Sequence, residues 1–218
     1  CTLDKNNFNG RSKLQAHIID INIKEFLFED LRFMNYDISK IDNTSLKLSK
    51  YKDDKASNFY LYKDIDKLDT DFEYIYLLDI PNSKDYLERI TNLNPKKVFL
   101  ICEEKQILSD VYFIDKNRLI KLFNLILSTN NKQINVAQQL DKLLSVLKTN
   151  VDSLKIMIQI FKELELINFV NNTIILNPDY KTVDLKKSSS FIRMENIFEV
   201  ENLLLKESIT NINKILEV

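Results

Sequence analysis

Gly10 is the only glycine among the 218 residues, and His17 is the only histidine. A P-loop and a dinucleotide-binding fingerprint each need several glycines, because the backbone must approach phosphate closely. Zinc-hydrolase motifs and other multi-histidine metal sites need more than one imidazole, and two cysteines are too few for a four-cysteine site. We therefore predict that this chain has no catalytic site and binds no metal or other cofactor.

The sole glycine lies in an Asn-Gly pair, Asn9-Gly10, which is typical of a tight turn because glycine adopts positive φ without steric cost. Apolar and polar residues then alternate over residues 15–22, which predicts a half-buried strand in which His17 is structural or solvated. The chain begins with a cysteine inside this β-hairpin. This start predicts a fragment whose first strand belongs to a larger sheet.

The composition is that of a globular protein, with 44% hydrophobic and 29% charged residues. The net charge of −1 excludes binding of nucleic acid through overall charge alone. We find no signal peptide and no apolar run that could span a bilayer, and the cysteines form no disulfide framework. We expect a cytoplasmic protein without membrane contact.

The first half of the chain predicts a small α/β layer over residues 25–115. Residues 73–81 are apolar nearly throughout, as expected for a strand that is covered on both faces, residues 96–102 predict another buried strand, and a helix capped by Ser83 lies between them. Strand, helix and strand with short links form a βαβ unit with parallel strands. Residues 58–62 predict a further short strand, whereas residues 33–57 show no sustained period.

No residue at the carboxyl ends of these strands, where ligands of such sheets bind, indicates a site. Asp79 and the Glu103-Glu104 pair follow the strands without a glycine turn or a basic group, so we expect them to be structural. The acidic residues of 64–73 lack the spacing of a calcium loop and predict a solvated loop.

The second half changes to helical periodicity and predicts a winged-helix-like domain over residues 116–180. The expected elements are helices at 117–129, 135–148 and 153–167, the last capped by Asp152 or Ser153, and a hairpin at 169–178 that turns at Asn171-Asn172.

Residues 181–218 predict a linker and one or two amphipathic helices that dock on the α/β layer. Their expected apolar face consists of Ile197, Val200, Leu203, Leu204, Ile215 and Leu216.

The third helix of the winged-helix-like domain has more acidic than basic residues, and residues 168–177 of the wing contain no Lys or Arg. The domain therefore lacks the basic residues that would bind DNA phosphates. This favours a role for the winged helix in packing or protein contact over recognition of a DNA sequence. The candidate partner or DNA surface on this helix is Lys155, Gln159 and Lys162.

The N-terminal hairpin is the better nucleic-acid candidate, because an aromatic side chain beside basic groups can stack on a base. The candidate residues are Phe8, Asn9, Gly10, Arg11 and Lys13. Alternatively, Phe8 fills the core of a barrel.

Several segments, in order, resemble the C-terminal part of RecJ, a family of single-strand-specific DNA exonucleases. In the opening segment, Asn6, Phe8, Asn9, Gly10, Gln15 and Asp20 match the last hairpin of the family's oligonucleotide-binding (OB) barrel. The similar segments are NNFNGRSKLQAHIIDI (6–21), EDLR (29–32), FIDKNRLIKLF (113–123), MIQIFKELELINFVNNTI (157–174) and LKKSSSFIRMENIFEVENLLL (185–205). The resemblance is greatest to the extended RecJ proteins of low-GC Gram-positive bacteria.

The resemblance implies that residues 1–24 are the remnant of an OB barrel. It also implies a parent enzyme that degrades single-stranded DNA from the 5′ end with Mn²⁺ or Mg²⁺ in a catalytic core that this chain lacks. The chain would then be an accessory region in DNA repair and recombination. Its implied partners are single-stranded DNA and, among proteins, single-strand-binding protein and a repair helicase. A free-standing winged-helix DNA-binding regulator and a small-molecule enzyme are the alternatives.

Overall fold

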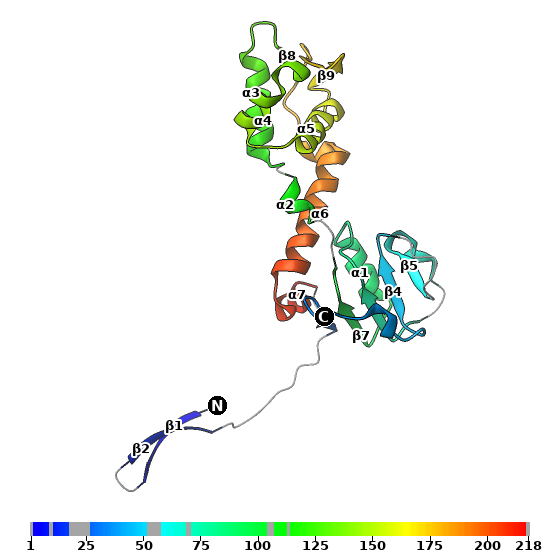
Figure 1. Ribbon diagram of the computed structural model, residues 1–218, viewed down its shortest axis with the longest axis vertical. Coiled ribbons are helices and arrows are strands. Elements are labelled where there is room, and N and C mark those ends of the chain that lie inside the picture. The colour runs from blue at the N-terminus through cyan, green and yellow to red at the C-terminus, as the bar shows by residue number, and fades with distance from the viewer. Residues whose placement is uncertain are drawn as a thin grey trace.

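The computed structural model describes residues 27–51, 58–68, 71–103, 107–112 and 114–216, together with the backbone of two strands, residues 2–8 and 11–17. The described part has a mixed α/β architecture, as predicted, with a five-stranded parallel sheet and a separate group of helices (Figure 1). None of the helices in these ranges is both long and apolar enough to cross a membrane.

The two N-terminal strands pair as the sequence predicts. Strand β1 (Thr2–Phe8) is antiparallel to β2 (Arg11–His17), with Phe8 opposite Arg11. The predicted turn residues Asn9 and Gly10 lie outside the described residues, as do residues 18–26. Membership of this hairpin in an OB barrel stays a prediction.

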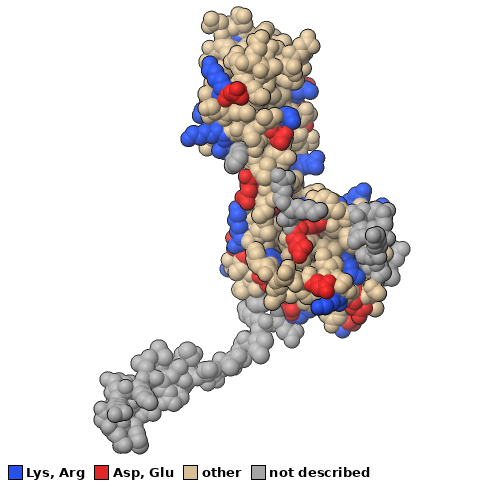
Figure 2. Space-filling model, in the orientation of Figure 1, with Lys and Arg blue, Asp and Glu red and all other residues tan. Residues whose placement is uncertain are grey.

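The parallel sheet has the strand order β3-β7-β6-β4-β5. Its strands are β3 (Phe28–Asp30), β4 (Leu46–Ser49), β5 (Phe59–Leu61), β6 (Tyr74–Leu77) and β7 (Lys97–Leu100). Helix α1 (Asp85–Asn92) connects β6 to β7, which pair in parallel, so the predicted βαβ unit is confirmed. Acidic and basic side chains are interspersed over this part of the surface (Figure 2).

Two local predictions in this half were wrong. Strand β4 lies in the segment for which we predicted no regular structure, although all four of its residues are buried. Lys47 and Ser49 alternate with its leucines and conceal that it lies inside the sheet, between β6 and β5. Helix α1 has Lys84 at its N-cap instead of Ser83, whose Oγ accepts a long 3.3 Å hydrogen bond from the Asp85 N–H.

The second group of elements follows a regular order of helices and strands. It comprises α3 (Lys116–Ser128), β8 (Gln133–Asn135), α4 (Val136–Leu147), α5 (Val151–Glu163), β9 (Ile167–Val170) and β10 (Thr173–Leu176). The strands form an antiparallel sheet in the order β8-β10-β9. Asn171 and Asn172 take the left-handed conformation, with φ of 48° and 59°, which confirms the predicted turn.

The predicted bounds of the third helix were wrong at both ends. Its N-cap is Asn150, whose side chain accepts a 2.8 Å hydrogen bond from the Ser153 N–H, so neither Asp152 nor Ser153 is the cap. The helix ends at Glu163, and Glu165 takes a left-handed φ of 56° that turns the chain into β9. Strand β8 escaped prediction because it is only three residues long.

Helix α6 (Ser189–Lys206) runs between the two groups (Figure 1). Near its start, Met194 belongs to the core of the α3–α5 group, while Val200 and Leu204 near its end belong to the core of the parallel sheet. The predicted docking is therefore confirmed for the end of the helix, whereas its start packs on the other core.

Helix α7 (Ile209–Ile215) closes the edge of the sheet beside β3. The buried Asn213 accepts a 3.0 Å hydrogen bond from the Phe28 N–H and donates one of 3.3 Å to the Phe28 carbonyl. Ile215 does not take part in the predicted docking face, because it is 46% exposed.

The remaining helices are short. They are α2 (Leu108–Val111) and three 3₁₀ helices, η1 (Ile38–Lys40), η2 (Tyr62–Lys67) and η3 (Leu185–Lys187). The buried Glu201 of α6 accepts hydrogen bonds of 2.8 and 2.7 Å from the Leu108 and Ser109 N–H groups at the start of α2. Helix α6 thus also holds the connection between the two groups in place.

Candidate partner and nucleic-acid interface

The predicted nucleic-acid residues of the hairpin remain predictions. Phe8, Arg11 and Lys13 lie on strands of which the structure describes the backbone, and Asn9 and Gly10 lie outside the described residues. Because Lys13 pairs with Asn6 in the register and Phe8 with Arg11, the strand backbone places these residues near the closed end of the hairpin.

The structure brings Lys155, Gln159 and Lys162 together along a single groove. We call this cavity of about 430 Å³ between α4, α5 and the β9–β10 turn the α5 groove. Its floor is apolar and includes Val136, Leu140, Leu154, Ile158 and Phe169. The groove therefore combines an apolar surface with two lysines on its rim.

Acidic neighbours reduce the positive charge of this groove. The Lys155 ammonium forms a 2.9 Å ion pair with Asp152, and Gln159 donates a 3.0 Å hydrogen bond to Glu163. Such an arrangement is weaker as a phosphate grip than a cluster of unpaired lysines.

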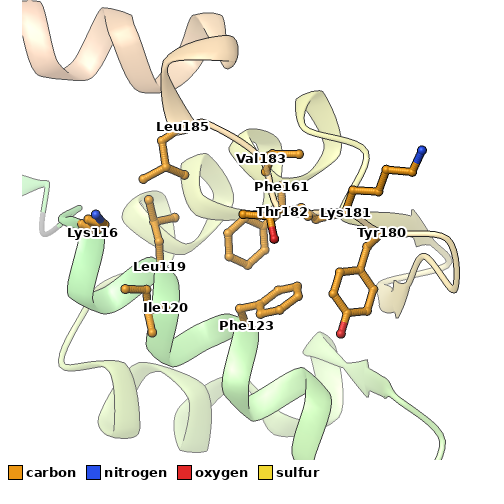
Figure 3. A pocket seen from close by; sticks show the side chains of 11 residues that line it. Lys116, Leu119, Ile120, Phe123, Phe161, Tyr180, Lys181, Thr182, Val183 and Leu185 are labelled. Atoms are coloured by element: carbon orange, nitrogen blue, oxygen red, sulfur yellow. The ribbon is translucent and has the colours of Figure 1, made fainter.

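A second cavity, which the sequence did not predict, meets α5 at Phe161. This α3 pocket, of about 310 Å³, is formed by α3, α5 and residues 180–185 (Figure 3). Leu119, Ile120 and Phe123 of α3 line it together with Phe161. The sequence predicts a linker at the start of residues 181–218, whereas the structure folds residues 180–185 against α3. The signal for this contact in the sequence is the apolar stripe that Leu119, Ile120 and Phe123 form on α3.

The carboxyl end of the parallel sheet holds a buried carboxylate with a structural role. Asp79 accepts a 2.9 Å hydrogen bond from the Lys50 N–H and another from the Ser49 hydroxyl, and its carbonyl accepts one of 2.5 Å from the Tyr62 hydroxyl. These bonds tie β4, η2 and the end of β6 together, in agreement with the structural role predicted for Asp79. Glu103 ends the described segment there, and Glu104 lies outside it. Over the described ranges, no three His, Cys, Asp or Glu side chains are grouped so as to hold a metal ion.

Arg32, in the Asp-x-Arg segment that resembles RecJ, joins the first strand of the sheet to the end of α6. Its guanidinium forms a two-pronged contact with Asp30, of 2.8 and 2.6 Å, and donates to the carbonyls of Leu204 and Glu207. The hydrogen bonds from Arg32 are the main reason that the pKa of Asp30 lies below its ordinary value. This motif is therefore structural.

Glu163, at the end of α5, binds the start of α6. Its carboxylate accepts hydrogen bonds from the hydroxyls of Ser188 and Ser190, both of 2.6 Å, and from the Ser190 N–H. Burial raises the pKa of Glu163, but these hydrogen bonds outweigh burial and bring it to about 2. Ser188 also caps α6, because its hydroxyl accepts from the Phe191 N–H, so the Ser-x-x-aromatic segment is structural as well.

Comparison with known proteins identifies the class of this chain. Residues 18–216 match the family described as single-strand DNA-specific exonuclease, C terminal domain. The match covers most of the chain, and the chain belongs to this family, which confirms the RecJ-type resemblance. Neither the curated proteins nor the solved structures contain a match.

Proposed function

We propose that this chain is the accessory C-terminal region of a RecJ-type exonuclease that degrades single-stranded DNA from the 5′ end. It supports DNA binding and recruits repair proteins such as single-strand-binding protein or a helicase, and it has no nuclease activity of its own. The family match over residues 18–216 carries this proposal. The Mn²⁺ or Mg²⁺ of the reaction binds in a catalytic core outside this chain.

The order of elements supports a winged helix in the second half. Helix α3, strand β8, helices α4 and α5 and the β9–β10 hairpin follow one another, and β10 lies between β8 and β9. We propose domains at residues 25–115 and 116–180, each with the core described above, and a C-terminal segment at 181–218 that connects them. Residues 1–24 complete an OB barrel of the parent protein.

We propose that single-stranded DNA contacts the N-terminal hairpin and that the α5 groove is a second surface for DNA or a protein partner. Arg11 and Lys13 supply positive charge, Phe8 stacks on a base, and Lys155 and Lys162 add a weaker contact on the groove. The family match favours this role over that of a free-standing DNA-binding regulator.

Replacing Arg11 and Lys13 together by alanine tests the DNA contact. Fluorescence titration with labelled oligothymidylate should show binding weakened by about tenfold. Each phosphate contact releases counterions from the DNA on binding, and the variant loses this favourable contribution at two contacts. The slope of log K against log salt should fall by about 1.4, since a single-strand contact contributes about 0.7. The matched control replaces Lys142 and Arg193, two exposed residues outside the α5 groove, by alanine and should bind as the unchanged chain does. Equal affinity and slope for both variants would show that the hairpin does not contact DNA.

A further inference from the structure

We propose that the carboxyl edge of the parallel sheet binds a phosphate group, either inorganic phosphate or the phosphate of a small monoester such as a nucleotide. The site is a cavity at the ends of β4, β5 and β6, which we call the β4 pocket. It shares no residue with the N-terminal hairpin or the α5 groove, so this inference goes beyond the proposed function and does not depend on it.

The β4 pocket lies where the topology of the sheet favours a ligand site. Strands β4 and β6 are parallel neighbours, but the chain leaves the carboxyl end of β4 for β5 on one side. From the carboxyl end of β6 it passes through α1 to β7 on the other side. Two connections that depart in opposite directions leave a crevice between them, and open α/β sheets bind ligands in such crevices. Because the sequence did not predict β4, it did not indicate this crevice.

Residues that follow three different strands line the pocket, which has a volume of about 140 Å³. Ser49 and Lys50 lie at the end of β4, and Lys63 follows β5 in η2. Asn82 and Tyr86 lie between β6 and β7. The volume is below the range of about 300–1,000 Å³ for pockets that enclose drug-sized ligands. It therefore suits an ion of the size of phosphate better than a whole nucleoside.

The charge of the lining favours an anion. Lys50 and Lys63 each contribute an ammonium group, and the described residues of the lining include no carboxylate. The buried Asp79 lies next to the pocket, but its carboxylate accepts hydrogen bonds from the Ser49 hydroxyl and the Lys50 N–H. These bonds disperse the negative charge of Asp79 within the edge of the sheet, so the two ammonium groups dominate the lining.

The acidic residues on the same short helix as Lys63 have basic partners outside the pocket. Asp64 forms a 2.6 Å ion pair with Lys67, and Asp66 pairs with Arg89 of α1. Neither carboxylate lines the pocket. These pairs offset the negative charge of η2, so the positive charge of Lys63 acts on an ion in the pocket.

The kinds of donor in the pocket favour phosphate over a carboxylate ligand. Lysine binds phosphate as a point charge, whereas the planar fork of an arginine matches a carboxylate. The described residues of the lining include two lysines and no arginine. The Asn82 amide and the Tyr86 hydroxyl add neutral donors for further oxygen atoms, of which phosphate has more than a carboxylate.

The test titrates the ¹⁵N-labelled whole chain with inorganic phosphate, thymidine 5′-monophosphate or thymidine and follows the amide signals by NMR. The two phosphate compounds should shift the signals of residues that line the β4 pocket in a saturable way. Thymidine, which has no phosphate group, should leave them unchanged. Equal affinities for the two phosphate compounds would assign the site to inorganic phosphate, and tighter binding of the monophosphate would assign it to a monoester.

Replacing Lys63 by Ala should weaken this binding by about tenfold, because the variant loses one charge-assisted hydrogen bond to the ligand. Asn82→Ala should have a smaller effect, since the amide is a neutral donor. The matched control is Lys96→Ala, which removes an exposed lysine at the amino end of β7 and should bind phosphate as the unchanged chain does. Lys63 and Asn82 are exposed, and unchanged melting temperatures show that each variant is folded.

Several results would overturn this inference. Signals that shift around lysines throughout the chain, without saturation, would show that phosphate interacts with surface charge alone. Equal shifts with thymidine and its monophosphate would exclude a phosphate site, as would equal affinities of the Lys63→Ala and Lys96→Ala variants. Failure here with intact DNA binding at Arg11 and Lys13 would leave the proposed function standing, whereas the reverse result would overturn the DNA contact alone.

Discussion

Replacing Arg32 by Met should lower the free energy of unfolding by about 3 kcal/mol. We expect this loss to be larger than that from removing any other single charged side chain of the chain. Arg32 is 7% exposed, and its side chain bridges Asp30 on β3 to the carbonyls of Leu204 and Glu207 at the end of α6. Its loss leaves a partly buried carboxylate and two carbonyls without their cationic partner, which is costly.

Urea denaturation followed by circular dichroism measures this loss. Arg32→Lys should restore little of it, because an ammonium cannot reproduce the fork that contacts Asp30 and both carbonyls. The matched control is Arg89→Met. Arg89 pairs with Asp66 where both side chains are exposed, so this variant should lose no more than about 0.5 kcal/mol. Similar losses for Arg32→Met and Arg89→Met would contradict the bridging role of Arg32.

Replacing Glu163 by Gln should destabilise the chain by about 2 kcal/mol at neutral pH and remove part of its acid sensitivity. The pKa of Glu163 is lowered from 4.5 to about 2 in the folded chain, so folding is favoured by the ionised carboxylate. This stabilisation is fully present above pH 4.5 and is lost as the pH falls toward 2.

Stability measured between pH 7 and pH 2.5 separates the effect of Glu163 from a general effect of charge. The difference between the unchanged chain and Glu163→Gln should be largest above pH 5 and shrink as the pH falls. Glu199→Gln, which changes an exposed glutamate of α6, should leave the profile nearly unchanged. A constant difference at all pH values would show that the hydrogen bonds of Glu163 do not depend on its charge.

The sequence predicted the elements whose patterns are long and local. Strands β6 and β7 lie in apolar runs, which indicate burial on both faces of a strand. Helices α3, α4 and α5 have sustained helical periodicity, which indicates burial along one face of a helix. Strands β3 and β8 span three residues each, and β4 alternates Lys47 and Ser49 with its leucines, so none of the three is an apolar run. Their burial depends on neighbours that are distant in sequence, and no local pattern contains that information.

The candidate sites were predictable to a different degree. Lys155, Gln159 and Lys162 repeat at helical spacing, and the structure places them on one groove. The α3 pocket depends on Tyr180 and Leu185 folding back over α3 from a segment without periodicity. The roles of Arg32 and Glu163 likewise depend on contacts with α6 that connect residues far apart in sequence.

The most direct test of the central claim is a nuclease assay of the purified chain on 5′-labelled single-stranded DNA with Mn²⁺. We predict no cleavage above the buffer control, because we propose that the reaction takes place in a catalytic core outside these residues. Cleavage that EDTA abolishes and that follows the chain through every purification step would contradict this account.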